Sequence, residues 1–305
     1  MKLGLITNTA SKSETARFEL TPRGLQFIAD YEAMARETEQ LSHMPLALSQ
    51  EQLTILRLFD KPRELVELPD MGRVSVLVPT LNEAKNIVVL LNDLANKLPA
   101  IKEVVLLDGS TDDTAQVARV LGARVILQDG RGKGTALRQA FEVDYDGDII
   151  VSIDADGSNR TEEIPRLVEE IIKGADVAKG SRFLKGGGST DLTRIRRIGN
   201  RLFVALVNLV WSTDYTDLCY GFVAYKKDAI AKLAPVLEAD HFEIETEIFI
   251  KAWKLGLKVV EVPSVELKRR YGESKLRGVH DSFRILKTIL HELASSAHER
   301  LSSTA

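Results

Sequence analysis

The amino-acid sequence predicts an α/β protein: a largely parallel sheet with helices on both faces, preceded by a helical extension. The alternation of segments along the chain predicts the sheet. From Arg73 onward, apolar segments of strand length alternate with amphipathic segments of helix length. Strands separated by helices of this length form βαβ units, so their sheet is parallel and covered on both sides.

The strand-like segments of this region follow one another in a regular order. They are VSVLVP, KEVVLLD, ARVILQ, DIIVSID and DVAKGS, over residues 74–79, 102–108, 123–128, 148–154 and 176–181. Helices are expected between them, over residues 83–98, 111–122, 133–143 and 162–174. The first of these helices carries apolar residues spaced for one face, namely Ile87, Leu90, Leu91, Leu94 and Leu98.

The two ends of the chain differ from this alternating region. Residues 1–70 are predicted to form a helical extension and a linker, with helices over 21–41 and 48–59 that begin at Thr or Ser N-caps. Residues 71–305 are predicted to form the main domain. Its last helix has a narrow apolar seam suited to a membrane surface, to the first seventy residues or to a second subunit. The seam comprises Val279, Phe283, Leu286, Leu290 and Leu293.

Composition and charge exclude several classes of protein. The net charge of −3 gives no overall basic field for nucleic acid. Cys219 is the single cysteine, which excludes an internal disulfide, indicates a reducing, cytoplasmic compartment and favours a small buried residue over a nucleophile. No signal peptide is expected at the N-terminus. The longest apolar run, Leu202–Trp211, is too short to cross a bilayer and is predicted to be a buried helix.

Two aspartates follow the strand DIIVSID. Asp154 and Asp156 are separated by one residue, so their side chains point the same way. Two carboxylates this close repel each other unless a cation lies between them. Mg²⁺ or Mn²⁺ would remove the repulsion, together with a phosphate group of a substrate. The alternative is a solvated turn in which aspartates only favour the bend.

The other strand ends add groups suited to a nucleotide. Asp108 is placed to accept hydrogen bonds from a nucleobase. The segment DGRGKGTAL puts glycines and two cations, one of them Lys133, before a helix N-terminus, which suits an anion. Arg182 ends the fifth strand and carries a fork of donors for phosphate. Ligands of such sheets bind beyond the carboxyl ends of the strands.

An ordered set of motifs gives a family resemblance. VSVLVPTLNE, VVLLDGSTDDT, RGKGTAL, IDADGS, KGSRF, GNRLF, DLCYGF, FEIETEIFIKAWKLGLKVVEVP and RRYGESKL occur in this order. Together they resemble the family-2 nucleotide-sugar glycosyltransferases of the GT-A fold, in the branch of dolichol-phosphate mannose synthase. The resemblance covers Arg73 to about Leu290. It implies metal-dependent, inverting transfer of a hexose from a UDP- or GDP-sugar.

The resemblance also implies roles for individual residues. Those implied to contact the nucleoside are Pro79, Leu81, Glu83 and Asp108. The tripeptide Asp154–Ala155–Asp156 would bind the metal and the diphosphate, with Asp156 catalytic. Arg182 would contact phosphate, and Arg269 and Lys275 would hold the donor diphosphate and the acceptor. The chain departs from the family pattern at Leu107, where an acid is usual, and at Ser158, where a glutamine is usual.

The acceptor is left open. A hydroxyl acceptor needs a general base, for which Glu245 and Glu247 are candidates, whereas a phosphate acceptor needs none. The same acids would also suit a helix dipole. Polyprenyl phosphate and a soluble acceptor remain alternatives. So do peripheral membrane contact and self-association. The basic cluster RIRRIGNR either meets phosphate or lipid, or is the solvated face of a helix that buries Ile195, Ile198 and Leu202.

Two other classes of protein compete with a glycosyltransferase. A nucleotidyltransferase also pairs acids with a metal on an α/β sheet, but its glycine-rich loop after the first strand is absent here, where the chain reads PTLNEAKN. A non-catalytic sugar-nucleotide binding module is disfavoured by the intact aspartate pair and the two phosphate-binding arginines.

Overall fold

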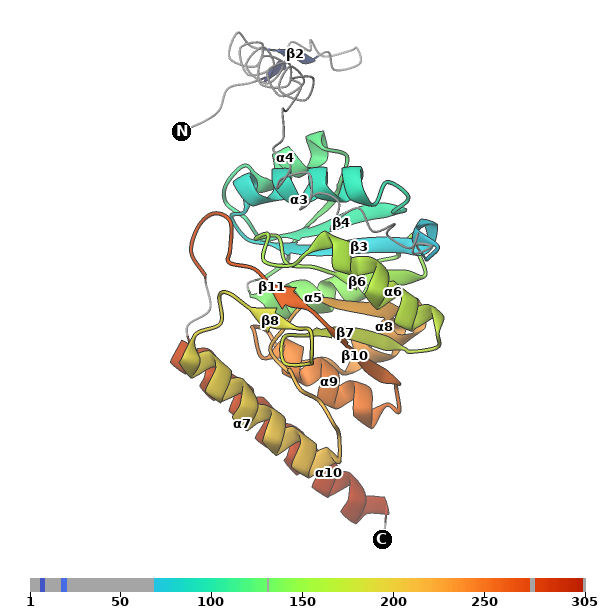
Figure 1. The fold of residues 1–305 in the computed structure, drawn as a ribbon, viewed down its shortest axis with the longest axis vertical. Helices are drawn as coiled ribbons and strands as arrows, with labels where there is room; N and C mark the ends of the chain where they lie inside the picture. Colours follow the sequence, from blue (N-terminus) through green and yellow to red (C-terminus); the bar gives the residue numbers. More distant parts are fainter. Residues whose placement is uncertain (1–5, 9–17, 21–68, 131, 275–277, 304–305) are drawn as a thin grey trace, which may run out of the picture. The chain divides into compact units, whose positions relative to one another are not determined.

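The structure, a computed structural model, divides into two units, Met1–Val66 and Glu67–Ala305. It describes residues 6–8, 18–20, 69–130, 132–274 and 278–303 (Figure 1). The described part of the first unit is an antiparallel pair of short strands, β1 (Ile6–Asn8) and β2 (Phe18–Leu20). The two helices expected in the extension lie outside the described residues.

The second unit is built on one seven-stranded sheet. The strands are β3 (Val74–Thr80), β4 (Glu103–Asp108), β5 (Arg124–Leu127), β6 (Ile149–Ser152), β7 (Val177–Ser181), β9 (Val223–Lys226) and β10 (Val259–Pro263). Their order is β10–β7–β9–β6–β3–β4–β5. Only β9 is antiparallel to its neighbours. A small parallel pair, β8 (Gly188–Ser189) and β11 (Val265–Glu266), lies apart from the main sheet.

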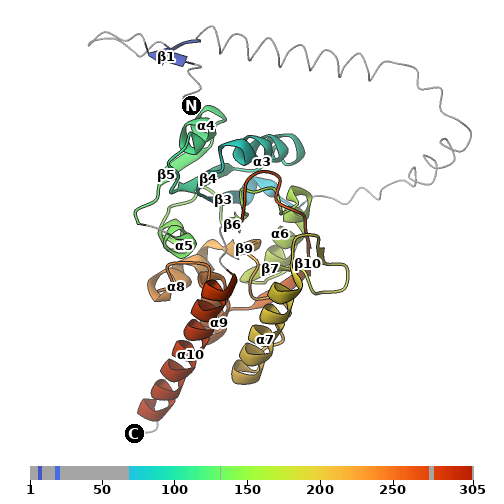
Figure 2. The ribbon, with the colours of Figure 1, turned by 90° about the vertical axis from the view of Figure 1, so that its left-hand side faces the viewer.

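Helices cover both faces of this sheet (Figures 1 and 2). On one side are α3 (Ala84–Lys97), α4 (Thr114–Val120) and α6 (Ile164–Ile172). On the other are α5 (Lys133–Phe141), α8 (Lys227–Leu233) and α9 (Ile244–Lys254). Two longer helices, α7 (Arg194–Trp211) and α10 (Gly278–Ser303), pack beside α9. Short 3₁₀ turns lie at Met71–Arg73, Thr161–Glu163 and Ala234–Val236.

Alternation along the strands divides the core in two. In β3, Val76 and Val78 face the layer of α3 and α6, whereas Leu77 faces the layer of α5 and α9. All three side chains are fully buried. Because successive side chains of a strand point to opposite faces, an apolar strand fills both cores at once. The predicted largely parallel sheet with helices on both faces is therefore confirmed.

The path of the chain creates a place for a ligand. It runs from β3 outward to β4 and β5, and then returns to the other side of β3 as β6. The strand order reverses at this point, so the loops after β3, β4 and β6 diverge and leave a crevice at the carboxyl ends of the strands. Asp154 and Asp156 follow β6 directly, at this crevice.

Three sequence-based expectations need correction. Strand β9, in the segment GFVAYK, was not predicted, and it enters the sheet in the antiparallel direction. The helix expected from residue 111 begins at Thr114, because Asp112 accepts hydrogen bonds from the backbone and hydroxyl of Thr114 and holds the preceding residues in a turn. Leu202–Trp211 is only half-buried, since Val207 and Trp211 are buried but Leu202 and Leu209 are exposed.

The arginine-rich start of α7 does not match one of the two interpretations given for it from the sequence. Ile195, Ile198 and Leu202 were expected to be the buried side of a helix whose arginines face water. They are exposed instead. The buried face of α7 is made by Asn200, Val207 and Trp211, so the apolar residues between the arginines contribute nothing to the described core.

The side of α10 that packs against the domain is not the predicted seam but a different stripe of residues. Ile285 and Ile289 are buried against the domain. One turn further on, the buried carboxylate of Glu292 lies 3.0 Å from Lys251 and 2.6 Å from Lys254 of α9. Breaking such a buried ion pair is costly, which fixes this face inward. The described seam residues Phe283, Leu286, Leu290 and Leu293 consequently remain exposed. No helix in the described part of the chain is long and apolar enough to cross a bilayer.

Candidate active site

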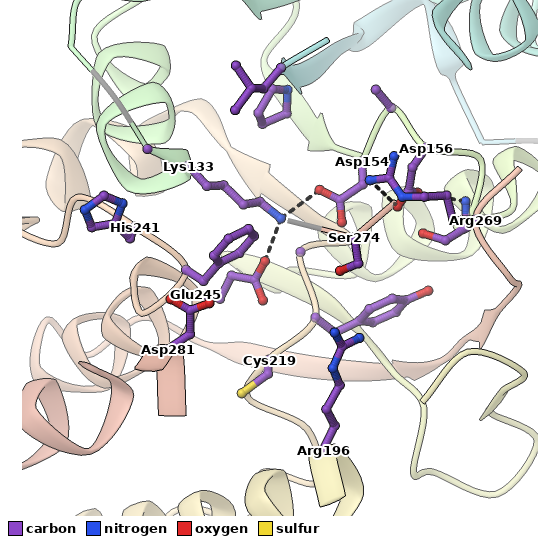
Figure 3. A pocket seen from close by; sticks show the side chains of 18 of the residues that line it. Lys133, Asp154, Asp156, Arg196, Cys219, His241, Glu245, Arg269, Ser274 and Asp281 are labelled. Carbon is purple, nitrogen blue, oxygen red and sulfur yellow. Dashed lines mark hydrogen bonds and ion pairs between the residues drawn. The ribbon is translucent and has the colours of Figure 1, made fainter. Parts of the chain in front are cut away.

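A pocket of about 750 Å³ opens at the carboxyl ends of the strands (Figure 3). Its floor comes from the loops after β3, β4 and β6, and one wall comes from the start of α5. The opposite wall comes from the first turns of α7 and α10. Of the predicted residues it is lined by Pro79, Leu81, Glu83, Lys133, Asp154, Ala155, Asp156, Arg182, Glu245 and Arg269.

Lys133 occupies the centre of the pocket. Its ammonium group lies 2.7 Å from Asp154 Oδ1 and 2.6 Å from Glu245 Oε1 (Figure 3). The preceding Gly132 has a φ of 113°, and a Cβ there would lie 2.1 Å from the carbonyl oxygen of Asp240. Glycine is therefore required at this position. It lets the chain turn into α5 so that Lys133, the first residue of the helix, points at the aspartates.

The charges of this cluster depend on one another. Burial alone would lower the pKa of Lys133, but Asp154 and Glu245 together raise it well above its ordinary value. Burial raises the pKa of Glu245, and Asp154 adds to this effect while Lys133 opposes it. The lysine is therefore held charged between two carboxylates of which one, Glu245, resists ionisation.

A second ion-pair cluster holds Asp156. The Arg269 guanidinium lies 3.2 Å from Asp156 Oδ2 and 2.8 Å from Glu83 Oε1. Backbone hydrogen bonds fix this geometry, because the N–H of Arg270 donates to the carbonyl oxygen of Asp156 at 3.0 Å. Glu83 and Arg269 thus contact each other directly, although the family resemblance implies a nucleoside contact for Glu83 and a diphosphate contact for Arg269.

The two aspartates fit a divalent cation shared with a substrate. Both present hard carboxylate oxygens to the pocket, which is the ligand type that Mg²⁺ and Mn²⁺ prefer. Asp156 Oδ1 is oriented by the N–H of Ser158 at 2.9 Å. Nowhere in the described residues do three or more His, Cys, Asp or Glu side chains gather into a metal site. The remaining ligands of a cation here would come from substrate phosphate or water.

Arg182 lines the pocket, but its guanidinium already donates hydrogen bonds to other groups of the protein. Its guanidinium donates to both oxygens of Asp217, at 2.7 and 2.9 Å, and to the carbonyl oxygen of Cys219 at 2.6 Å. It also donates to Glu266 at 3.2 Å. Asp217 is fully buried, so breaking this pair would leave an unpaired charge in the interior. The arrangement makes Arg182 a brace between β7 and the loop before β9.

The neighbouring acids Glu245 and Glu247 face opposite ways. Glu245 points into the pocket. Glu247 points away and accepts hydrogen bonds from the backbone N–H groups of Glu238 and Ala239, at 2.9 to 3.2 Å. It thereby fixes the loop that carries Asp240, whose carbonyl oxygen lies against Gly132. Of the two candidates for a base, only Glu245 is within reach of a substrate.

Two other predicted residues are not placed at the surface of the pocket. Asp108 is buried, and its Oδ1 accepts hydrogen bonds from Thr80 at 2.7 Å and Ser110 at 2.5 Å. Its neighbours Gly109 and Thr111 line the pocket instead. Lys275 lies outside the described residues.

Two functional candidates were missed by sequence reasoning. A Cβ at Gly221 would lie 2.7 Å from Lys133 Nζ and 2.8 Å from Glu245 Oε1, so this glycine leaves room for the central ion pairs. Arg196 of α7 reaches into the pocket from the opposite wall (Figure 3). Gly221 lies in the quoted motif DLCYGF and Arg196 in the cluster RIRRIGNR, but nothing in either segment marks which residue faces the ligand.

Cys219 also lines the pocket. Burial raises the pKa of its thiol to about 12. At neutral pH the side chain is a thiol and not a thiolate, which agrees with the expectation that Cys219 is not a nucleophile, although the residue is only partly buried.

Comparisons with known proteins agree with this geometry. The family model described as "Glycosyl transferase family 2" matches residues 75–234. The chain is 30% identical to "Glycosyltransferase AglJ" of Haloferax volcanii over 67% of its own length and 66% of that protein. It is 35% identical to a dolichol-phosphate mannosyltransferase of Pyrococcus furiosus, over 68% of its own length and 60% of that protein.

A solved structure with a similar fold is glucosyl-3-phosphoglycerate synthase from Mycobacterium tuberculosis. The TM-score is 0.60 at 24% identity, over 72% of this chain and 80% of that one. This likeness supports the GT-A architecture. The family match covers more than half of the chain and includes the crevice with both aspartates. The chain therefore belongs to glycosyl transferase family 2.

Proposed function

We propose that the chain transfers a hexose from a nucleoside diphosphate sugar to polyprenyl phosphate, with inversion at the anomeric carbon. One observation carries this proposal: two carboxylates and two cations, Lys133 and Arg269, meet at the switch point of the sheet. Such a site binds a diphosphate and neutralises the charge that develops on it as the sugar leaves. A metal bound to Asp154 and Asp156 would supply further electrostatic stabilisation of the leaving diphosphate.

The residues of this chain would divide the work between binding and orientation. Arg269 would exchange part of its pairing with Glu83 and Asp156 for donor phosphate. Lys133 would stay between Asp154 and Glu245 and hold both carboxylates in place. The wall made by α7 would meet the acceptor, since Arg196 has no acidic partner among the described residues and is available to an anion. A phosphate acceptor is already a nucleophile and needs no base.

The donor can be identified without knowledge of the acceptor. Incubation with UDP-glucose, UDP-N-acetylglucosamine or GDP-mannose is expected to release nucleotide slowly from one of them. Release should require Mg²⁺ or Mn²⁺ and stop when EDTA removes the metal. Equal release with and without EDTA would contradict the metal role of the aspartate pair. Release from none of the donors, with or without polyprenyl phosphate, would contradict the proposed reaction.

A soluble hydroxyl acceptor is the second candidate, and the position of Glu245 favours it. A base must be deprotonated to act, and burial raises the pKa of Glu245. With a hydroxyl acceptor, kcat/KM should therefore rise with pH through this raised pKa, and Glu245→Gln should abolish the rise. Glu247→Gln is the matched control, because Glu247 faces away from the pocket. A Glu245→Gln enzyme that keeps the wild-type profile would exclude Glu245 as the base.

A further inference from the structure

The outward faces of α7 and α10 carry large apolar side chains in water. Ile195 and Leu209 are each 81% exposed, and Phe283 is 70% exposed. Leu202 and Leu290 are also exposed. The two helices contact each other and extend together away from the sheet (Figures 1 and 2). We call these five residues the apolar face.

The side chains of the apolar face follow a regular spacing, and they are separate from the side chains that pack in the core. Ile195, Leu202 and Leu209 are seven residues apart and therefore share one side of α7. Phe283 and Leu290 have the same spacing on α10. The other sides of both helices are buried, through Val207 and Trp211 in α7 and through Ile285 and Ile289 in α10. Both helices thus already have a packed side, and each presents a second apolar stripe outward.

The charges beside the apolar face have one sign. α7 contains four arginines and no acidic residue, in a chain whose net charge is −3. Arg194 and Arg201 are exposed and have no acidic partner among the described residues. On α10 the exposed Lys287 adds a further cation. The described acids of α10, Asp281 and Glu292, are buried. The described residues of these two faces include no exposed acid, so a second copy packed face to face would not match the arginines, whereas the phosphates of an anionic lipid surface would.

The pocket opens at the basic end of this face. Ile195 and Arg196 from α7, and Ser282 and Ile285 from α10, line its wall. A surface that contacts the apolar face would therefore lie next to the pocket mouth. Arg196 would lie between the apolar face and the pocket, since it is half-buried and its side chain points into the pocket (Figure 3).

We propose that the apolar face of α7 and α10, with Arg194 and Arg201, docks on the surface of an anionic bilayer. The apolar side chains enter the boundary between headgroups and acyl chains, and the arginines meet lipid phosphate. Docking in this way places the pocket mouth at the headgroup level. The proposal concerns binding to lipid and does not depend on which sugar is transferred or to what.

The test is binding of the full chain to vesicles in the absence of donor and acceptor. Vesicles of equal parts phosphatidylcholine and phosphatidylglycerol should float the protein, and vesicles of phosphatidylcholine alone should do so much less. Leu209→Ser with Phe283→Ser should lower binding about tenfold or more. The matched control is Val120→Ser with Leu127→Ser, two exposed apolar residues on other elements, which should bind as the wild type does.

A second pair of variants tests the charge. Arg194→Gln and Arg201→Gln should each weaken binding to the anionic vesicles roughly fivefold, whereas Arg119→Gln on the exposed side of α4 should not. The proposal is overturned if the full chain fails to bind anionic vesicles, or if Leu209→Ser with Phe283→Ser binds as well as the control pair. It is also overturned if sedimentation shows a dimer that this pair of changes dissociates. Vesicle binding is measured without turnover, so its failure is distinct from failure of the proposed reaction.

Discussion

Two sides of the pocket differ in how their charges are compensated. One is formed by the strand ends and the start of α5 and is called the strand-side wall below, and the other is formed by α7. On the side of the strand ends, each cation that lines the pocket has a carboxylate partner: Lys133 has Asp154 and Glu245, and Arg269 has Asp156 and Glu83. On the side of α7, Arg196 has no acidic partner among the described residues. The first wall is assembled before any ligand arrives. The second wall is incomplete by itself.

Under the proposed function, this difference assigns one ligand to each side of the pocket. A metal and a diphosphate bring charges of both signs, so they can replace ion pairs one for one without leaving a buried charge alone. A phosphate monoester acceptor carries between one and two negative charges at neutral pH and brings no cation, so an arginine without an acidic partner among the described residues suits it. The contrast predicts that changes on the strand side abolish chemistry, whereas changes on the α7 side weaken acceptor binding.

The largest effect is expected at Asp156. Asp156→Ala removes the partner of Arg269 and one of the two carboxylates proposed to bind a metal, so turnover should fall by about a thousandfold or more. The side chain is at the surface of the pocket, and the thermal unfolding midpoint should change little. The measurement is nucleotide release at saturating donor. Turnover within tenfold of the wild type would mean that the strand-side wall is not the donor site.

The next largest effect is expected at Gly221. In Gly221→Ala the new methyl group would lie 2.7 Å from Lys133 Nζ, so the central lysine must move. A displacement of this kind in an assembled site costs about a hundredfold in kcat/KM. Gly188→Ala is the control, because a Cβ there meets nothing within 4 Å. Equal kcat/KM for the two variants would show that the Lys133 ion pairs are not needed for the reaction.

Much of the strand-side wall could be predicted from the sequence. The strands, the switch to polar residues at their ends and the pair Asp154 and Asp156 are local patterns, because strand periodicity and turn chemistry act over a few residues. The buried stripe of α3 is equally local, and the predicted Ile87, Leu90 and Leu94 are all buried.

The remaining features depend on tertiary structure. The ion pair between Lys133 and Glu245 joins residues that are 112 positions apart. Glu245 and Glu247 look alike in sequence, and only the packing of α9 decides which one faces the pocket. The same holds for α10, where Glu292 and its two lysines fix which of two apolar stripes turns inward. The antiparallel β9 also carries no local signal, since a short apolar strand reads the same in either direction.

A moderate effect is expected at Arg196, and it sharpens the contrast between the walls. Arg196→Gln removes the charge offered to the acceptor, so KM for an anionic acceptor should rise about tenfold. KM for the donor and the rate of slow donor hydrolysis should stay near the wild-type values, because the strand-side wall is untouched. Arg197→Gln, on the same helix but outside the pocket lining, is the control. A rise in the KM for the donor would mean that Arg196 binds the donor, and the proposed division between a donor side and an acceptor side would be wrong.

The smallest effect on activity is expected at Glu247. In Glu247→Gln an amide NH₂ group replaces one of the oxygens that accept from the N–H groups of Glu238 and Ala239, so one buried hydrogen bond is lost. The free energy of unfolding should fall by about 1–2 kcal/mol, measured by urea denaturation. Activity should fall only a fewfold, because the loop that carries Asp240 keeps its contact with Gly132 and Thr135. A loss of activity as large as that of Gly221→Ala, without a loss of stability, would instead assign Glu247 a direct role and contradict its placement behind the pocket.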